Sequence, residues 1–392
     1  MSNRSIDLEN QDLGNRDPAL EEQKQENAPN EPGVDPKGAP VNEFEQEVEG
    51  VSLTKDAWRR LKKNKMAMFG LVAVIIYAII SLAAPILPIY SYRVQVPAHR
   101  DLPPSLTKSA GELWYERERN YMLQLNEAQD VEGGLTQQQQ EQLAQIQERI
   151  ETDTMVVDGE QIMTHQRHYL LGTDNLGRDM LARIIYGGQV SIAIGLVGTT
   201  VSVLIGILLG SLAGYVGGKT DYMIMRVVDV MYGLPYMLIV IILMAIFGSN
   251  IFNLFVALSL VSWLTVARVV RGQIISLKNS EFVEAARSMG AGTWRIIFRH
   301  LVPNTLGVII VFSTLRVPQF IMQEAFLSFL GLGISAPYAS WGSLVGDAVD
   351  AMSASPWRLF FPALAMTIFL FAMNFLGDGL RDAFDPHSKN RQ

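Results

Sequence analysis

Six long apolar stretches constrain this chain more than any other feature. They cover residues 66–89, 190–213, 230–247, 251–267, 306–329 and 359–376. A helix needs about 20 mostly apolar residues to cross the hydrocarbon core of a bilayer. A helix on a soluble core would carry a polar face, and these stretches carry none. The sequence therefore predicts an all-α integral membrane protein with six transmembrane helices, the third and fourth forming a tight hairpin around 248–250.

The orientation of the spans follows from lysine and arginine, which concentrate in the cytoplasmic flanks of membrane helices. Basic residues precede the first span, follow the sixth, and lie at 219–226 and 268–299, whereas 248–250 and 330–357 contain none. All four basic segments fall on one side only if both termini are cytoplasmic. Residues 93–167 are then extracytoplasmic.

The segments outside the spans differ in composition. Residues 1–50 hold thirteen acidic and four basic residues and almost no aliphatic clusters, so we expect a disordered cytoplasmic tail. Residues 51–92 are expected to form an amphipathic helix on the membrane surface followed by the first span, or one helix that simply extends that span. A short cytoplasmic tail is expected at 388–392.

The extracytoplasmic insertion at 93–167 has its own helical pattern. Residues 110–131 and 135–152 favour helices, with a break at Gly133-Gly134, and Leu143, Ile146 and Ile150 recur on one face. The pattern predicts a small helical hairpin that either docks on a partner or packs on itself.

Signals for catalysis or cofactor binding are weak. The chain has no cysteine, which excludes disulfides, thiolate zinc sites and cysteine nucleophiles. Residues 217–220 end like a phosphate-binding loop, but Ala213 stands where that pattern needs glycine and an apolar span precedes it. His165 and His168 are three residues apart without a third ligand of matching spacing. We expect no enzyme, no metal and no cofactor bound by this chain.

The cytoplasmic loop at 268–303 is the most informative segment. Glu281 and Glu284 favour the start of a helix, and Gly290 permits a sharp turn after it. Pro303 suits the first turn of the fifth span. The sequence thus predicts a short exposed helix, a glycine break and a second helix, an arrangement suited to insertion into a groove on another protein.

This loop resembles the EAA motif of ATP-binding cassette (ABC) importer permeases, in which E-A-A is followed by a glycine and later by a proline. Val302 and His300 depart mildly from the usual leucine and isoleucine. In that family the helix is the coupling helix, seated in a cleft of the nucleotide-binding subunit. The resemblance implies coupling to an ATPase for Glu284, Ala285, Ala286, Gly290 and Arg295.

Three further stretches, 168–179, 324–342 and 377–386, are similar to signatures of the dipeptide and oligopeptide permease C subunits. The match covers about 51–92 and 166–387, and it implies a type I ABC importer transmembrane domain whose core permease domain spans 168–387. The first stretch contains the signature residues Gly172, Thr173, Asp174, Gly177, Arg178 and Asp179.

The resemblance also implies a function and partners. The chain would form the peptide path in a bacterial inner membrane with a homologous second permease, fed by an extracytoplasmic solute-binding protein. Two partner subunits would bind and hydrolyse ATP with magnesium, and no nucleic acid is expected. Nickel or an antibiotic peptide remains an alternative cargo. An ion-coupled secondary transporter, which would be expected to show repeats or broken helices, and a scaffold or receptor are rival readings.

Polar residues within the fifth span mark a candidate translocation path. Arg316, Gln319, Gln323 and Glu324 surround Pro318 and are expected on one helical face. Charged side chains in a bilayer usually face a cavity or the bundle interior. These residues would either line the path or pair within the permease interface. Asn374 in the sixth span is a weaker candidate.

Overall fold

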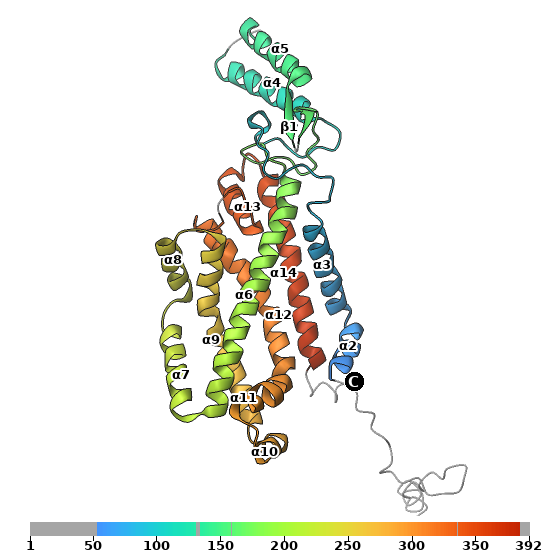
Figure 1. Cartoon of the computed structure of the whole chain (residues 1–392). Helices are drawn as coiled ribbons and strands as arrows, with labels where there is room; N and C mark the ends of the chain where they lie inside the picture. The colour runs from blue at the N-terminus through green and yellow to red at the C-terminus, as the bar shows by residue number, and fades with distance from the viewer. Residues whose placement is uncertain (1–52, 131–133, 158, 335, 385–392) are drawn as a thin grey trace, which may run out of the picture. The chain divides into compact units, whose positions relative to one another are not determined.

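The computed structural model describes residues 53–130, 134–157, 159–334 and 336–384, and the tails expected at 1–50 and 388–392 lie outside this part. The described chain is mostly helical (Figure 1). Its membrane-type helices are α3 (Lys65–Leu82), α6 (Met180–Val216), α9 (Ile251–Leu277), α12 (Val302–Phe329, continuous with residues from Thr293) and α14 (Trp357–Phe384). A bent pair, α7 (Gly218–Tyr232) and α8 (Tyr236–Phe247), supplies a sixth span if it is counted as one.

The third span differs from its prediction. A continuous helix over 230–247 is wrong, because α7 ends at Tyr232, α8 begins at Tyr236, and their axes differ by 84°. Pro235 explains the break, since proline lacks an N–H and disfavours helical geometry in the residue before it. The twelve residues of α8 reach only about 18 Å. The hairpin with α9 is confirmed, with Gly248 ending α8 and Asn250 capping α9.

Helix α6 lies against α9 and α12 in the middle of the bundle (Figure 1). Its glycines permit this close approach: a β-carbon at Gly210 would lie 2.4 Å from the carbonyl oxygen of Ala267, and one at Gly206 would lie 2.5 Å from Val266. Small residues replace side chains at such contacts, because backbones can then approach each other within a membrane.

The first helices pack on the last one. Asn64 accepts hydrogen bonds from the backbone N–H groups of Met66 and Ala67 and starts α3 anew, so α2 (Leu53–Lys63) is a separate helix and not an extension of the first span. Ala57 and Leu61 of α2 are buried in a cluster with Ala383 of α14. The apolar side of α2 is therefore held by protein.

The loop before the fifth span has the predicted order of helix, glycine break and helix. Helix α10 (Glu281–Ser288) precedes Gly290, whose φ is +80°. Helix α11 (Thr293–Ile296) continues through the π-helical turn η3 (Ile297–Leu301) into α12, with Pro303 in its first turn.

The insertion at 93–167 contains the predicted helical hairpin, α4 (Ala110–Ala128) and α5 (Gln137–Thr152), each begun by a capping box. The sequence interpretation missed three short elements in the insertion, the 3-10 turn η2 (Pro97–His99) and the antiparallel strands β1 (Thr154–Val157) and β2 (Glu160–Met163). Outside the insertion it also missed α13 (Trp341–Ala348) and the 3-10 turn η4 (Val349–Ala351) before α14. Strands of four residues are too short for a clear alternating pattern.

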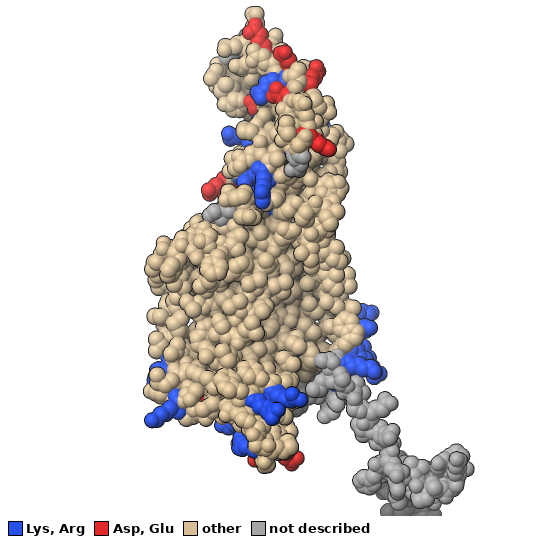
Figure 2. Space-filling view, in the orientation of Figure 1, with Lys and Arg blue, Asp and Glu red and all other residues tan. Residues whose placement is uncertain are grey.

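The charges of the described chain divide along the bundle. On the face shown in Figure 2, lysine and arginine gather at the end that carries α2, α7 and α10. The surface between that end and the insertion is uncharged on this face. This division is what a membrane-spanning protein requires, because ionised side chains are costly against lipid.

Candidate functional site

Helix α10 is a surface helix with one anchored face. Val283 and Ala286 are buried in a cluster with residues of α9 and α12, among them Val270 and Ile309. Glu284 and Ala285 point away from this cluster and are exposed. The two alanines of the motif therefore differ in role: Ala286 fastens the helix, whereas Ala285 leaves room on the exposed side.

Gly290 ends α10 for a conformational reason. Its φ of +80° lies in the left-handed region, yet a β-carbon there would have no neighbour within 4 Å. The amide of Ala291 then donates to the carbonyl of Ala286 at 3.0 Å, which closes the turn. Arg295 on α11 is exposed.

Exposed apolar side chains accompany the predicted coupling residues, and the sequence interpretation missed them. Met289 is 80% exposed and Trp294 is 55% exposed. Trp294 stacks on Phe298 one turn further along, with ring centroids 5.7 Å apart. Their spacing of four residues could have revealed the pair. Single exposed apolar residues are common, but such a cluster marks an interaction surface.

A hollow of about 360 Å³ that holds several polar side chains lies beside α12. It brings together three of the four predicted path residues, Arg316, Gln319 and Gln323. Residues from α9 and from both sides of the α7–α8 break complete its lining, including Tyr232, Tyr236, Ser262 and Thr265.

Hydrogen bonds already order the two tyrosines and Gln323 in this hollow. The Tyr236 hydroxyl donates to Oε1 of Gln323 at 2.8 Å and lies 3.2 Å from Oγ of Ser262. The Tyr232 hydroxyl lies 2.6 Å from Oγ1 of Thr265. Sequence reasoning missed both tyrosines, because only the break at 233–235 turns them toward α12.

A second hollow of about 510 Å³ adjoins the other side of the same helix. Gln319 and Gln323 line both hollows, and Asn374 of α14 lines this one. The structure thus places the weaker candidate, Asn374, next to the predicted path residues.

Glu324 does not share the face of the other three residues, and that expectation is wrong. Its side chain is fully buried, and Oε1 accepts hydrogen bonds from Ser328 and from Ser340, each at 2.6 Å. Its Oε2 has no hydrogen-bond partner among the described residues. One helical position beyond Gln323 is a rotation of about 100°, which turns Glu324 toward α13. It ties α12 to α13 and lines neither hollow.

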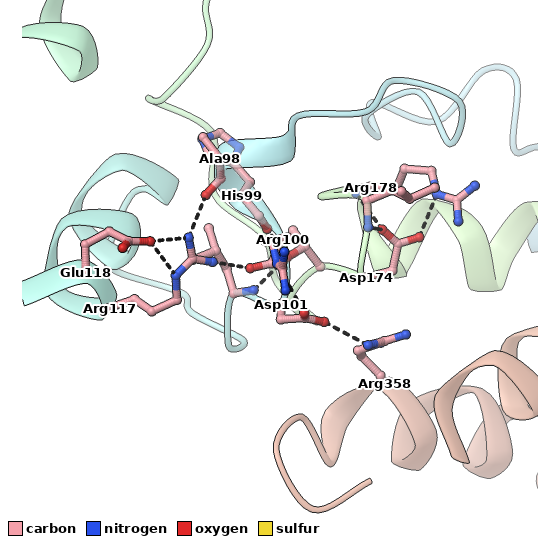
Figure 3. A network of polar contacts seen from close by, with 12 residues as sticks. Ala98, His99, Arg100, Asp101, Arg117, Glu118, Asp174, Arg178 and Arg358 are labelled. Atoms are coloured by element: carbon pink, nitrogen blue, oxygen red, sulfur yellow. Dashed lines mark hydrogen bonds and ion pairs between the residues drawn. The ribbon is translucent and has the colours of Figure 1, made fainter. Parts of the chain in front are cut away.

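The signature residues at 172–179 form a buried joint. Oδ2 of Asp174 accepts from Arg178 and from Arg183, each at 2.6 Å, and Oδ1 accepts from the backbone N–H groups of Leu176 and Arg178. Figure 3 shows the contacts between Asp174 and Arg178. Asp179 caps α6 through the backbone N–H groups of Leu181 and Ala182. These carboxylates are satisfied internally, so they have structural roles here.

The same joint fastens the insertion. Thr173 donates to the carbonyl of His99 and accepts from the backbone N–H of Leu102 at 2.8 Å. A β-carbon at Gly177 would lie 1.9 Å from the carbonyl oxygen of Val96, and one at Gly172 would lie 2.6 Å from the carbonyl oxygen of Leu102. Asp101 also pairs with Arg358 of α14 at 2.8 Å (Figure 3). The insertion is thereby clamped to the ends of α6 and α14.

The two histidines noticed in the sequence separate. Nδ1 of His165 lies 2.8 Å from Nε2 of His99, whose Nδ1 is 3.0 Å from the Tyr169 hydroxyl. Burial, together with the nearby His165, Arg167 and Arg117, lowers the pKa of His99 to about 3. His168 lies apart, against the carbonyl of Lys108. No group of three metal-ligating side chains occurs within the described ranges.

The glycine pair at 217–218 forms the turn between α6 and α7, with φ values of +67° and +54°. The segment is thus a connection between two helices, whereas a phosphate-binding loop follows a strand.

Comparison with known proteins yields two family matches. The family described as the binding-protein-dependent transport system inner membrane component matches residues 206–390. The N-terminal transmembrane domain of oligopeptide transport permease C matches residues 52–104. Together they cover both ends of the described bundle.

Individual relatives extend over most of the chain. The dipeptide transport system permease protein DppC of Bacillus subtilis (strain 168) is 39% identical to this chain, and the match covers 86% of this chain and 86% of the length of that protein. The oligopeptide transport system permease protein OppC of Escherichia coli (strain K12) is 39% identical to this chain, and the match covers 88% of this chain and 94% of the length of that protein. Among solved structures, the MetNI methionine ABC transporter in inward-facing conformations gives a TM-score of 0.43 at 17% identity, covering 52% of this chain and 97% of that chain.

Proposed function

Because this chain belongs to the family of binding-protein-dependent transport system inner membrane components, within the OppC and DppC permeases, we propose that it is the permease subunit of a bacterial ABC importer for dipeptides or oligopeptides. Permeases of this family assemble with a second permease and with ATP-binding subunits. The observation that carries the proposal is the extent of the likeness to DppC and OppC over nearly the whole described chain.

The exposed side of α10 is the surface through which the partner ATPase would transmit its conformational change to this permease. Two buried side chains hold α10 against α9 and α12, so a displacement of α10 would move these helices with it. Glu284 and the apolar pair Trp294–Phe298 would contact the ATPase. ATP and magnesium would be bound by that partner, and this chain would hold no cofactor of its own.

The hollows beside α12 would form this subunit's share of the translocation path. Arg316, Gln319 and Gln323 offer hydrogen-bonding groups within the membrane-spanning bundle. A second permease facing α12 would complete the path, and a solute-binding protein would deliver peptide on the side of the insertion. Both termini would lie in the cytoplasm.

Two other functions are less well supported. Nickel as cargo finds no support in the described residues, where no cluster of three metal-ligating side chains occurs. The broken pair α7–α8 is a feature of secondary transporters, but the matched relatives are permeases of peptide transport systems.

The decisive experiment is reconstitution of the full complex in vesicles with ATP inside, measuring uptake of a labelled tripeptide and of nickel. We expect ATP-dependent accumulation of the tripeptide alone, together with co-purification of the ATPases with this chain. Failure of any ATPase to co-purify with the inserted permease, or uptake driven by an ion gradient without ATP, would overturn the proposal.

Orientation is tested by single cysteines in this cysteine-free chain. An impermeant thiol reagent added to intact cells should label position 130 and leave position 290 unlabelled, and lysis should expose position 290. The reverse pattern would invert the proposed topology.

A further inference from the structure

Arg316 is a cation without a counter-charge inside the bundle. It lies in the middle of α12, and a guanidinium at such a place is costly unless it faces water or an anion. Within the described ranges no carboxylate pairs with it, and no aspartate or glutamate lines its hollow. The acidic residues nearest along α7 are engaged elsewhere, since Asp221 pairs with Arg271 and Asp229 with Arg268.

The rest of the lining is neutral, and most of its polar side chains are held by hydrogen bonds. Gln323 is held by the Tyr236 hydroxyl, and Tyr232 is held by Thr265. Gln319 is exposed toward the hollow and makes no hydrogen bond to any described residue. Met231, Leu234, Val261 and Leu264 supply apolar walls. A single cation, a free amide and apolar walls suit a small ligand with one carboxylate and variable neutral parts.

We propose that Arg316 binds the free α-carboxylate of the transported peptide, with the Gln319 amide beside the last peptide unit. The assignment rests on the proposed function and names a substrate contact for it. A guanidinium can hold a carboxylate through two parallel hydrogen bonds. Every linear peptide with an unmodified C-terminus carries this group whatever its sequence, so one arginine can select such peptides while the walls tolerate different side chains.

The test uses the purified complex of both permeases and the ATPases, without the binding protein, whose own preference would mask that of the path. Binding of labelled trialanine and of trialanine amide is measured by scintillation proximity for the wild type, Arg316→Gln and Arg316→Lys. Arg226→Gln is the matched control, because Arg226 is an arginine on α7 that lies outside this hollow.

The wild type and Arg226→Gln should bind the free acid at least about tenfold more tightly than the amide, as expected for hydrogen bonds between ionised partners. Arg316→Gln should bind both equally. Arg316→Lys should retain part of the preference, since it keeps the charge and loses the planar fork.

Three results would overturn the assignment. The first is equal affinity of the wild type for the acid and the amide, and the second is an acid preference that survives in Arg316→Gln. The third is loss of the second permease from the Arg316→Gln complex, because Arg316 would then pair with a carboxylate of that second permease. ATP-driven tripeptide uptake by the wild type is measured separately. Its absence would sink the proposed function, whereas its presence without acid preference would sink only the role of Arg316.

Discussion

The joint at 172–179 and the loop at 281–299 make an instructive pair, because both carry sequence signatures of the same family. In the joint, Asp174 and Arg178 are buried and their charges are satisfied by each other and by Arg183. In the loop, Glu284 and Arg295 are exposed and make no ion pair with any described residue. Signature residues that look alike in the sequence therefore serve different ends. The joint stabilises the fold, and the loop presents exposed side chains that a partner can contact.

The largest expected effect is on the joint. Asp174→Ala would leave the buried guanidinium groups of Arg178 and Arg183 without their anion, and removing one partner of a buried ion pair costs about 3–5 kcal/mol. We expect loss of insertion or a lower unfolding temperature in detergent. Glu284→Ala, the matched change in the loop, should leave that temperature unchanged. Equal stability of the two variants would remove the distinction.

Gly177 in the joint and Gly290 in the loop have similar φ angles, +71° and +80°, and they sharpen the comparison. Gly177→Ala brings a β-carbon to 1.9 Å from the Val96 carbonyl and should cost about 3 kcal/mol. Gly290→Ala meets no atom and should cost only about 1 kcal/mol from its positive φ. Thermal unfolding of both variants measures the difference. A Gly290 variant as unstable as the Gly177 variant would show that the loop is packed.

Low pH should destabilise the insertion, which the joint fastens, more than the helices that carry the loop. The pKa of His99 is lowered to about 3 in the folded insertion, so the unfolded state binds the proton more readily. The contribution of neutral His99 to the free energy of unfolding is fully present above pH 6.5 and declines as the pH falls toward 3. At pH 5 the free energy of unfolding is lower by about 2 kcal/mol.

Hydrogen exchange of the insertion should accordingly quicken between pH 6.5 and 5, after correction for the intrinsic rate, while protection of α9 stays constant. His99→Phe should flatten this dependence. An unchanged pH profile in His99→Phe would assign the acid sensitivity to other groups.

Glu284→Lys should also have only a small effect on stability, although it should abolish coupling. The change reverses a charge near the start of α10, where the helix dipole favours an anion, and the cost to folding is below about 1 kcal/mol. Stimulation of ATP hydrolysis by loaded binding protein and peptide uptake in the same vesicles should both fall at least tenfold. Glu281→Lys, at the first position of the same helix, is the control for charge alone. Wild-type coupling in Glu284→Lys would take the coupling role away from α10.

The sequence by itself determined the membrane class, the number of spans to within one bent pair, the helix–glycine–helix loop and the hairpin of the insertion. These features depend on local rules: the length of an apolar run, the capping of a helix, and the φ that a glycine permits. Arg316, Gln319 and Gln323 came together as predicted because they occupy one side of a single helix.

Only the tertiary structure decided which way the remaining groups face and what they meet. Glu324 turned to α13, Tyr232 and Tyr236 joined the hollow through the break in the third span, and His99 met His165 across 66 residues. Periodicity along one helix gives a side chain's angle about its own axis, but not the neighbours that lie at that angle. Those neighbours come from distant segments. Their packing decides whether a polar residue forms a buried hydrogen bond, stays exposed on the surface or lines a path.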